Sequence, residues 1–258
     1  IHCGLVGSEM CIRDSSLFNW SIAKPNLFWT SLLSYLDISY SGNENPAISE
    51  SENIYDKKFF PNLNLSYSEN IINNLNSIPI LYVNEIGFKK YYSKEEVIHK
   101  VNLVAKYLRS IGVKKGDRVV GIVTNNAETL ISFLAVNSIG AVWSSCSPDF
   151  GEQAILDRFS QIEPKILFYS SNYMYGGKKF EILEKIKNIE SKLNTLEVSI
   201  CIDYSQKDKS FIDEKLNFFE ENNRELSKLS FERCQFNDPM YILYSSGTTG
   251  KPKCIVHN

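Results

Sequence analysis

The second half of the chain alternates between short apolar runs and segments with helical spacing, and this alternation constrains the fold more than any other feature. Each apolar run is followed by a polar turn and then by a stretch in which apolar residues recur every three or four positions. Repeated strand–helix units of this kind place their strands in parallel, with helices covering the sheet. The sequence therefore predicts an α/β fold with a largely parallel sheet and flanking helices.

The expected elements follow from these patterns and their flanking turn residues. We expect parallel strands at 118–123, 141–145, 165–169, 198–202 and 240–244. Helices are expected at 127–139, 152–161 and 180–193. Upstream, we expect a hairpin of 80–83 with 88–92 and helices within 27–36, 64–75 and 93–111. Ser93 with Glu96, and Ser66 with Glu69, have the spacing of a capping box, in which each side chain bonds the backbone N–H of the other.

The chain divides into three segments by composition. Residues 1–15 have no Met at position 1, no period and no signal-peptide pattern, and we interpret them as foreign to the protein. Residues 16–75 are rich in aromatic residues, Asn and Ser, and they form an N-terminal region of their own. Residues 76–258 carry the strand–helix units. We expect the strand at 240–244 to lie at an unpaired edge of an incomplete sheet.

Bulk composition argues against several classes of function. The formal net charge is −2, so no strong basic field points to nucleic acid or to an anionic membrane. No apolar run reaches the roughly 18–20 residues of a membrane helix. The six cysteines form no C-x-x-C pair and lie near no histidine at ligand spacing, so we predict no metal site. Scattered thiols are typical of a reducing compartment, and we expect a cytoplasmic protein.

The segment from Tyr244 to Lys253 has the chemistry of a loop that holds phosphates. Gly247 and Gly250 let the backbone turn sharply and approach an anion, and exposed N–H groups in such a turn form an anion-binding nest. Lys251 and Lys253 supply charge, which strengthens hydrogen bonds to phosphate. Four hydroxyl side chains add donors: Ser245, Ser246, Thr248 and Thr249.

Other phosphate-binding motifs fit this segment less well. The pattern G-x-x-x-x-G-K-[ST] fails, because Gly247 and Gly250 are too close and Pro252 follows Lys251. The dinucleotide pattern G-x-G-x-x-G fails as well. A plain Ser/Gly turn between strands remains the structural alternative, although its position directly after an apolar strand favours a ligand site.

The same segment resembles the phosphate-binding signature of the adenylate-forming superfamily, which reads aromatic-[ST]-S-G-[ST]-T-G-x-P-K. The resemblance implies that residues 245–249 wrap the β- and γ-phosphates of ATP and that Gly250 belongs to the same loop. It implies that Lys253 stabilises charge as pyrophosphate leaves. It also implies Mg²⁺ and coenzyme A as partners of the reaction, and His257 matches a histidine of the short-chain branch.

Three further strings narrow the resemblance to one branch. S-P-D-F-G at 147–151, Q-I-E-P-K at 161–165 and G-A-V-W-S-S at 140–145 resemble the acetoacetyl-CoA synthetases. Residues 60–70 resemble the end of the N-terminal region of acetyl- and acetoacetyl-CoA synthetases. The resemblance implies the N-terminal part of the large domain of an acetoacetate–CoA ligase, with acetate or another short acid as the alternative substrate. We interpret Asp149 as a helix cap, Asp157 and Arg158 as a surface ion pair, Glu163 as part of a loop, and Trp143 as core.

The resemblance also places several expected motifs beyond Asn258. These are the segment near the adenylate, the acid that binds the ribose, the hinge, and a C-terminal domain with the main catalytic lysine. We therefore expect this chain alone to be an inactive fragment of the ligase. A non-catalytic nucleotide-binding module, or an inert truncated product, is the alternative from another class. The sequence leaves the oligomeric state open.

Overall fold

The computed structural model describes residues 8–75, 80–85, 87–202, 228–245 and 250–258. The chain divides into two compact units, one containing residues 1–65 and 233–238, the other containing residues 66–232 and 239–258. The segment expected to be foreign, 1–15, lies partly outside the described residues, and a helix begins at Ser8. None of the described helices is both long enough and apolar enough to cross a membrane.

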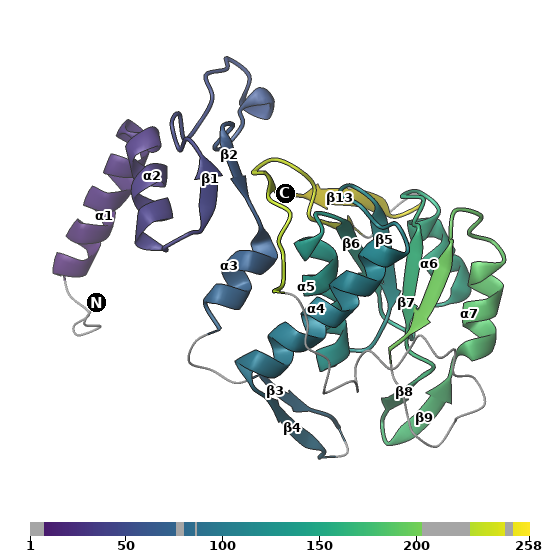
Figure 1. Ribbon diagram of the computed structural model, residues 1–258. Coiled ribbons are helices and arrows are strands. Elements are labelled where there is room, and N and C mark those ends of the chain that lie inside the picture. The colour runs from purple at the N-terminus through teal and green to yellow at the C-terminus, as the bar shows by residue number, and fades with distance from the viewer. Residues whose placement is uncertain (1–7, 76–79, 86, 203–227, 246–249) are drawn as a thin grey trace. The chain divides into compact units, whose positions relative to one another are not determined.

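The first unit has helices and a small antiparallel sheet (Figure 1). Its elements are α1 (Ser8–Ala23), α2 (Pro25–Tyr35), β1 (Tyr40–Gly42), the 3-10 helix η1 (Ile54–Asp56), β2 (Leu63–Leu65) and β11 (Cys234–Gln235). β2 is the central strand, and it pairs in antiparallel fashion with β1 and β11. Phe60 and Leu63 are buried in its core, with Trp29 packed against Phe59 edge to face. A strand distant in sequence therefore completes this sheet.

The second unit contains a six-stranded sheet in the order β10-β7-β5-β6-β12-β13. All neighbouring strands pair in parallel except β12 with β13. The strands of the unit are β3 (Ile80–Val83), β4 (Lys89–Tyr92), β5 (Arg118–Ile122), β6 (Val142–Cys146), β7 (Ile166–Tyr169), β8 (Asn172–Tyr175), β9 (Lys178–Glu181), β10 (Val198–Cys201), β12 (Tyr241–Ser245) and β13 (Lys253–His257). Its helices are α3 (Tyr67–Asn73), α4 (Lys94–Ser110), α5 (Ala127–Ser138), α6 (Glu152–Phe159) and α7 (Leu183–Glu190).

The strand period divides the core of this unit into two layers. Successive side chains of a strand point to opposite faces, so neighbours along β5 join different clusters. Val119 packs with residues of α4 and α5, whereas Val120 packs with residues of α6 and α7. Helices therefore cover both faces of the sheet, as the strand–helix pattern predicted (Figure 1).

Helix starts follow the predicted caps closely. Ser93 accepts a hydrogen bond from the Glu96 amide, and the Glu96 side chain accepts one from the Ser93 amide, which completes the capping box of α4. Ser66 caps α3 by accepting from the Glu69 amide. Helix α4 ends at Ser110, and Gly112 then has a φ of +84°, a left-handed conformation that favours glycine.

Two predictions are wrong. The helix expected over 180–193 begins only at Leu183, because residues 172–181 form the β8–β9 hairpin. Gly176 and Gly177, both with positive φ, form its turn, and a two-residue Gly-Gly turn is a hairpin signal that the sequence carried. Strand β12 is also not an edge, because β13 pairs along its whole length.

Candidate functional site

The phosphate-loop segment joins β12 to β13, and the sheet brings its two ends together. β12 runs parallel to β6, while β13 returns in antiparallel fashion beside it. The last pair of this ladder is Ser245 with Lys253. Directly opposed residues of an antiparallel pair point to the same face. The hydroxyl before the loop and the lysine after it are therefore neighbours, although seven residues separate them in the sequence.

The described part of the loop contains one glycine in a left-handed conformation and two exposed lysines. Gly250 has a φ of +111°, and a Cβ at this position would meet no atom within 4 Å. Its backbone conformation, rather than crowding, therefore demands glycine. Lys251 and Lys253 are exposed, and neither forms a salt bridge with another described residue. The predicted binding residues Ser246, Gly247, Thr248 and Thr249 lie outside the described residues.

Tyr244, directly before the loop, is held from two sides. The Ser144 hydroxyl donates to the carbonyl of Ile242, 2.8 Å away, and lies 3.1 Å from the Tyr244 hydroxyl. Arg158 of α6 places its guanidinium 5.6 Å from the centre of the Tyr244 ring and 5.0 Å from that of Phe150. Burial raises the pKa of the Tyr244 hydroxyl above its usual value, so the ring stays neutral.

The residues after the loop are also held by neighbouring side chains. The side-chain amide of Gln161 donates to the Pro252 carbonyl at 2.9 Å. Cys254 is half-buried against the cluster formed with α6 and α7, and burial raises the pKa of its thiol. The ring of His257 stacks on that of Tyr241, with 4.7 Å between their centres. The sequence predicted the loop but none of these supporting contacts.

A second feature lies at the carboxyl ends of the parallel strands. A cavity of about 840 Å³ opens there, and the carboxyl edge is the usual ligand site of a parallel sheet. It is lined by Val123, Thr124, Asn125, Thr129, Ser145, Cys146, Ser147, Pro148, Asp149, Tyr173, Met174 and Tyr175. Residues of the S-P-D-F-G string therefore line a cavity. Lys185 of α7 fixes this string by donating to the carbonyls of Pro148 and Phe150.

The polar residues near these strings have roles that differ partly from those expected. Asp149 lines the cavity and does not cap α6, whose N-cap is Gly151 without a side-chain hydrogen bond. Asp157 accepts from Gln153, and Arg158 lies over aromatic rings, so the expected ion pair between the two is wrong. The loop assignment of Glu163 is confirmed. Trp143 is buried and contacts Phe168, which confirms it as core.

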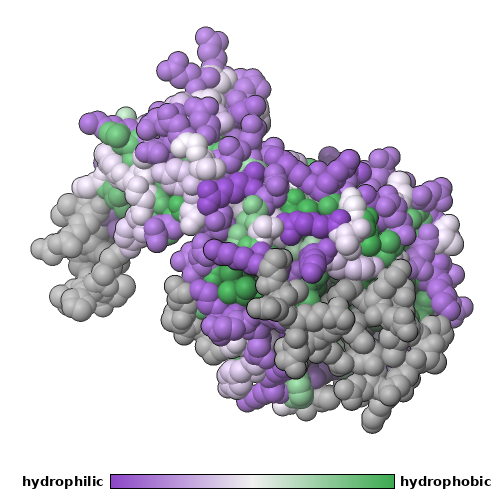
Figure 2. All heavy atoms as spheres, viewed as in Figure 1, coloured by the Kyte–Doolittle hydropathy of each residue, from purple (hydrophilic) through white to green (hydrophobic). Residues whose placement is uncertain are grey.

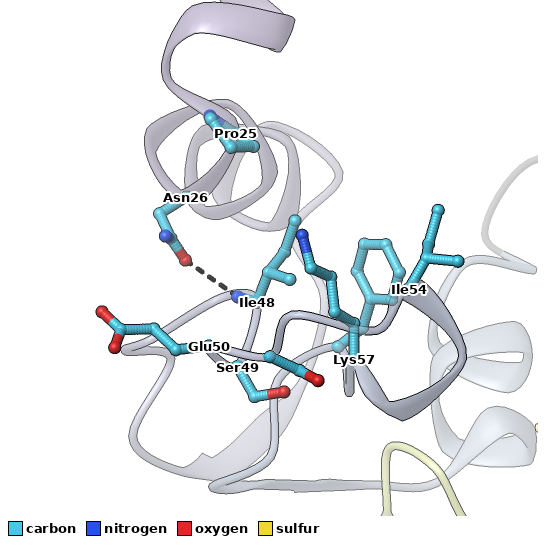
Figure 3. A pocket seen from close by; sticks show the side chains of 9 residues that line it. Pro25, Asn26, Ile48, Ser49, Glu50, Ile54 and Lys57 are labelled. Carbon is cyan, nitrogen blue, oxygen red and sulfur yellow. Dashed lines mark hydrogen bonds between the residues drawn. The ribbon is translucent and has the colours of Figure 1, made fainter.

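The first unit has a cavity of its own, shown in Figure 3. Its volume is about 530 Å³, and Asn26 accepts a hydrogen bond from the Ile48 amide beside it. Glu50 and Lys57 are its charged lining residues. None of the strings that carry the family resemblance contributes a residue to this cavity, whereas the S-P-D-F-G string lines the cavity at the sheet edge. The phosphate loop and the cavity at the sheet edge are therefore the two candidate features.

Comparison with known proteins agrees with this geometry. A model of the AMP-binding enzyme family matches residues 80–258, which include the β12–β13 hairpin. Acetoacetyl-CoA synthetase of Mus musculus is 37% identical over 256 residues, which are 95% of this chain and 38% of that protein. Acetoacetyl-coenzyme A synthetase of Rhizobium meliloti is 33% identical over 251 residues, covering 93% of this chain and 37% of that protein.

A solved structure matches the fold. Acetoacetyl-CoA synthetase from Streptomyces lividans superposes with a TM-score of 0.82 at 30% sequence identity, covering 92% of this chain and 37% of that one. The chain thus spans somewhat more than a third of the length of the relatives it matches.

Proposed function

The chain belongs to the AMP-binding enzyme family, and on this premise we propose that it is part of an ATP-dependent acid–thiol ligase. The proposed reaction converts acetoacetate, ATP and coenzyme A into acetoacetyl-CoA, AMP and pyrophosphate. We place it in the cytoplasm and in lipid metabolism. The observation that carries the proposal is the hairpin that sets Lys253 opposite Ser245 around a glycine-containing turn.

In the first step, a carboxylate oxygen of the acid attacks the α-phosphorus of ATP. The bond from that phosphorus to the bridging oxygen breaks, which gives the acyl-adenylate and pyrophosphate. Residues 245–250 would hold the β- and γ-phosphates, and Lys253 would stabilise the charge that collects on pyrophosphate as it leaves. Charged donors aimed at developing charge are a large source of rate enhancement.

In the second step, the thiolate of coenzyme A attacks the acyl carbon and displaces AMP. Mg²⁺ would offset negative charge on the phosphates of ATP. Among the described residues, no cluster of His, Cys, Asp and Glu side chains offers a metal site, so we assign none of them to the ion. We assign the cavity at the carboxyl edge of β5 and β6 to the substrate side of the site because residues of the S-P-D-F-G string line it.

Lys253→Ala tests the proposal in a protein that carries this chain together with the C-terminal part of its relatives. We expect acetoacetate-dependent exchange of pyrophosphate into ATP to slow by about 100-fold. The KM for acetoacetate should change much less, because Lys253 acts on phosphate rather than on the acid. Lys251→Ala is the matched control, since Lys251 is also exposed but lies outside the β13 ladder. Unchanged exchange in Lys253→Ala would contradict the role of Lys253.

The choice of substrate is tested separately. We expect kcat/KM to be at least about tenfold higher with acetoacetate than with acetate, a difference of about 1.4 kcal/mol in transition-state binding. A preference for acetate would support the alternative short-chain ligase. If no acid supports pyrophosphate exchange while ATP still binds, the non-catalytic nucleotide-binding module is the better explanation.

A further inference from the structure

Helix α6 and the turn after it contact the phosphate-loop hairpin on β12 and at the residue before β13. Arg158 lies over the ring of Tyr244, the residue before Ser245. The side-chain nitrogen of Gln161 lies 2.9 Å from the carbonyl oxygen of Pro252, the residue before Lys253. Both residues adjoining the binding pair Ser245–Lys253 are thus held by one neighbouring element.

The turn that carries Gln161 is itself fixed. The guanidinium of Arg118, at the start of β5, donates to the carbonyls of Ile162 at 2.7 Å and Glu163 at 3.0 Å. The Ile162 side chain is buried in the core between the sheet and helices α6 and α7. Gln161 also donates to the Asp157 carbonyl at 2.6 Å, which limits its rotamers. The side-chain amide of Gln161 is therefore held in one position relative to the turn.

Within the part of the chain that the structure describes, few other contacts fix the position of Lys253. β13 pairs with β12 alone among the described strands, and its side chains are largely exposed. Pro252 has no N–H with which to bond a neighbour, so its carbonyl is its one backbone hydrogen-bonding group. The peptide plane that this carbonyl shares with the Lys253 nitrogen sets the direction in which β13 begins.

We propose that Gln161 is a positioning residue for Lys253, acting through the Pro252 carbonyl. This inference rests on the proposed function for the role of Lys253, but the contact itself does not. Holding the peptide between Pro252 and Lys253 keeps the lysine aligned for the departing pyrophosphate. A small misplacement of a reacting group is enough to slow a reaction severely.

A purely structural role predicts a different result. Gln161 is exposed, and a neutral hydrogen bond at the surface contributes only about 1 kcal/mol to stability. If the bond served stability alone, its loss would shift the melting temperature slightly and leave the catalytic rate unchanged. If it positions Lys253, its loss lowers kcat and leaves KM for ATP nearly unchanged, with the same slight shift of the melting temperature.

Gln161→Met is the test variant, because Met has a similar length and no donor. Gln153→Met is the matched control. Gln153 lies on α6, is also exposed and donates to the Asp157 side chain, but forms no hydrogen bond to the described residues of the hairpin. In a protein active in pyrophosphate exchange, we expect Gln161→Met to lower kcat about tenfold, with KM for ATP within about twofold of its original value. An unchanged kcat, or an equal loss in Gln153→Met, would overturn the proposal.

Hydrogen exchange of the present chain gives a second readout that needs no activity. We expect amides in a peptide covering residues 252–258 to exchange several-fold faster in Gln161→Met than in Gln153→Met. Equal exchange in the two variants overturns the proposal even if the enzyme is active. If the unsubstituted protein shows no pyrophosphate exchange, the proposed function fails, and this measurement still decides whether Gln161 anchors the start of β13.

Discussion

Strand β5 and the β12–β13 hairpin belong to one sheet, yet they differ in how much of their side-chain surface is buried. Val119, Val120 and Ile122 of β5 are fully buried, with strands on both sides and helices on both faces. On the hairpin, Leu243, Ile255 and Val256 remain about half exposed. In the coloured part of Figure 2, hydrophilic residues cover more of the visible surface than hydrophobic ones.

The interior strand contributes mainly to stability, whereas the hairpin carries the residues that we propose to bind phosphate. Burial of apolar side chains in β5 contributes roughly 1.5–3 kcal/mol for each fully buried residue, so the interior of the sheet supports the unit. The hairpin packs Ile242, Tyr244 and Cys254 against the core, and backbone pairing and polar contacts from Ser144, Arg158 and Gln161 hold it as well. An exposed loop on a rigid sheet is the usual arrangement for a binding site.

The largest expected effect tests burial directly. Phe168 of β7 is 1% exposed and contacts Trp143, whereas Ile255 of β13 is 44% exposed. We expect Phe168→Ala to lower the free energy of unfolding by about 3–5 kcal/mol. Ile255→Ala should lower it by less than about 1 kcal/mol, because much of its side chain already meets solvent. Urea denaturation of both variants measures the difference. Similar decreases in the free energy of unfolding would contradict the distinction between the interior strand and the edge hairpin.

A smaller effect tests how tightly the interior is packed. A Cβ on Gly121 would lie 2.9 Å from the ring of Trp143 and 3.1 Å from the side chain of Val123. We expect Gly121→Ala to destabilise the protein by about 1–3 kcal/mol through overpacking. Gly151→Ser is the control, because a Cβ at Gly151 meets nothing within 4 Å and Ser is a good N-cap. If Gly121→Ala left the free energy of unfolding unchanged, the sheet would relax easily at this position.

The smallest effect concerns the end of β6, where interior and site meet. Burial raises the pKa of the Cys146 thiol to about 12, against about 8.5 in an unfolded chain. Between these values the unfolded state loses the proton while the folded state keeps it, so stability falls as pH rises. We expect the loss of stability between pH 8 and pH 10 to be about 1–2 kcal/mol larger in the unsubstituted protein than in Cys146→Ala. Denaturation of both proteins at the two pH values tests this, and parallel losses would contradict it.

Much of the fold could be predicted because local sequence patterns agreed with the elements that the tertiary structure contains. The capping pair Ser93–Glu96 and the apolar run at 118–123 produced the elements expected of them. The β8–β9 hairpin was missed because helical spacing in 183–193 was extended over residues that follow a Gly-Gly turn. Strand β13 was missed because its side chains are largely exposed, so it lacks the continuous burial that marks the inner strands.

The sequence by itself was enough to predict a phosphate loop, because backbone freedom at Gly250 and charge at Lys253 are properties of the residues themselves. It also determined that helices cover a parallel sheet, because apolar periodicity is local. Only the tertiary structure decided that Lys253 faces Ser245 and that Gln161 reaches Pro252 across 91 positions of sequence. Such contacts depend on strand order and register, which no local pattern encodes. The sheet thus decides which side chains lie beside the loop, whereas the residue types of the loop decide its chemistry.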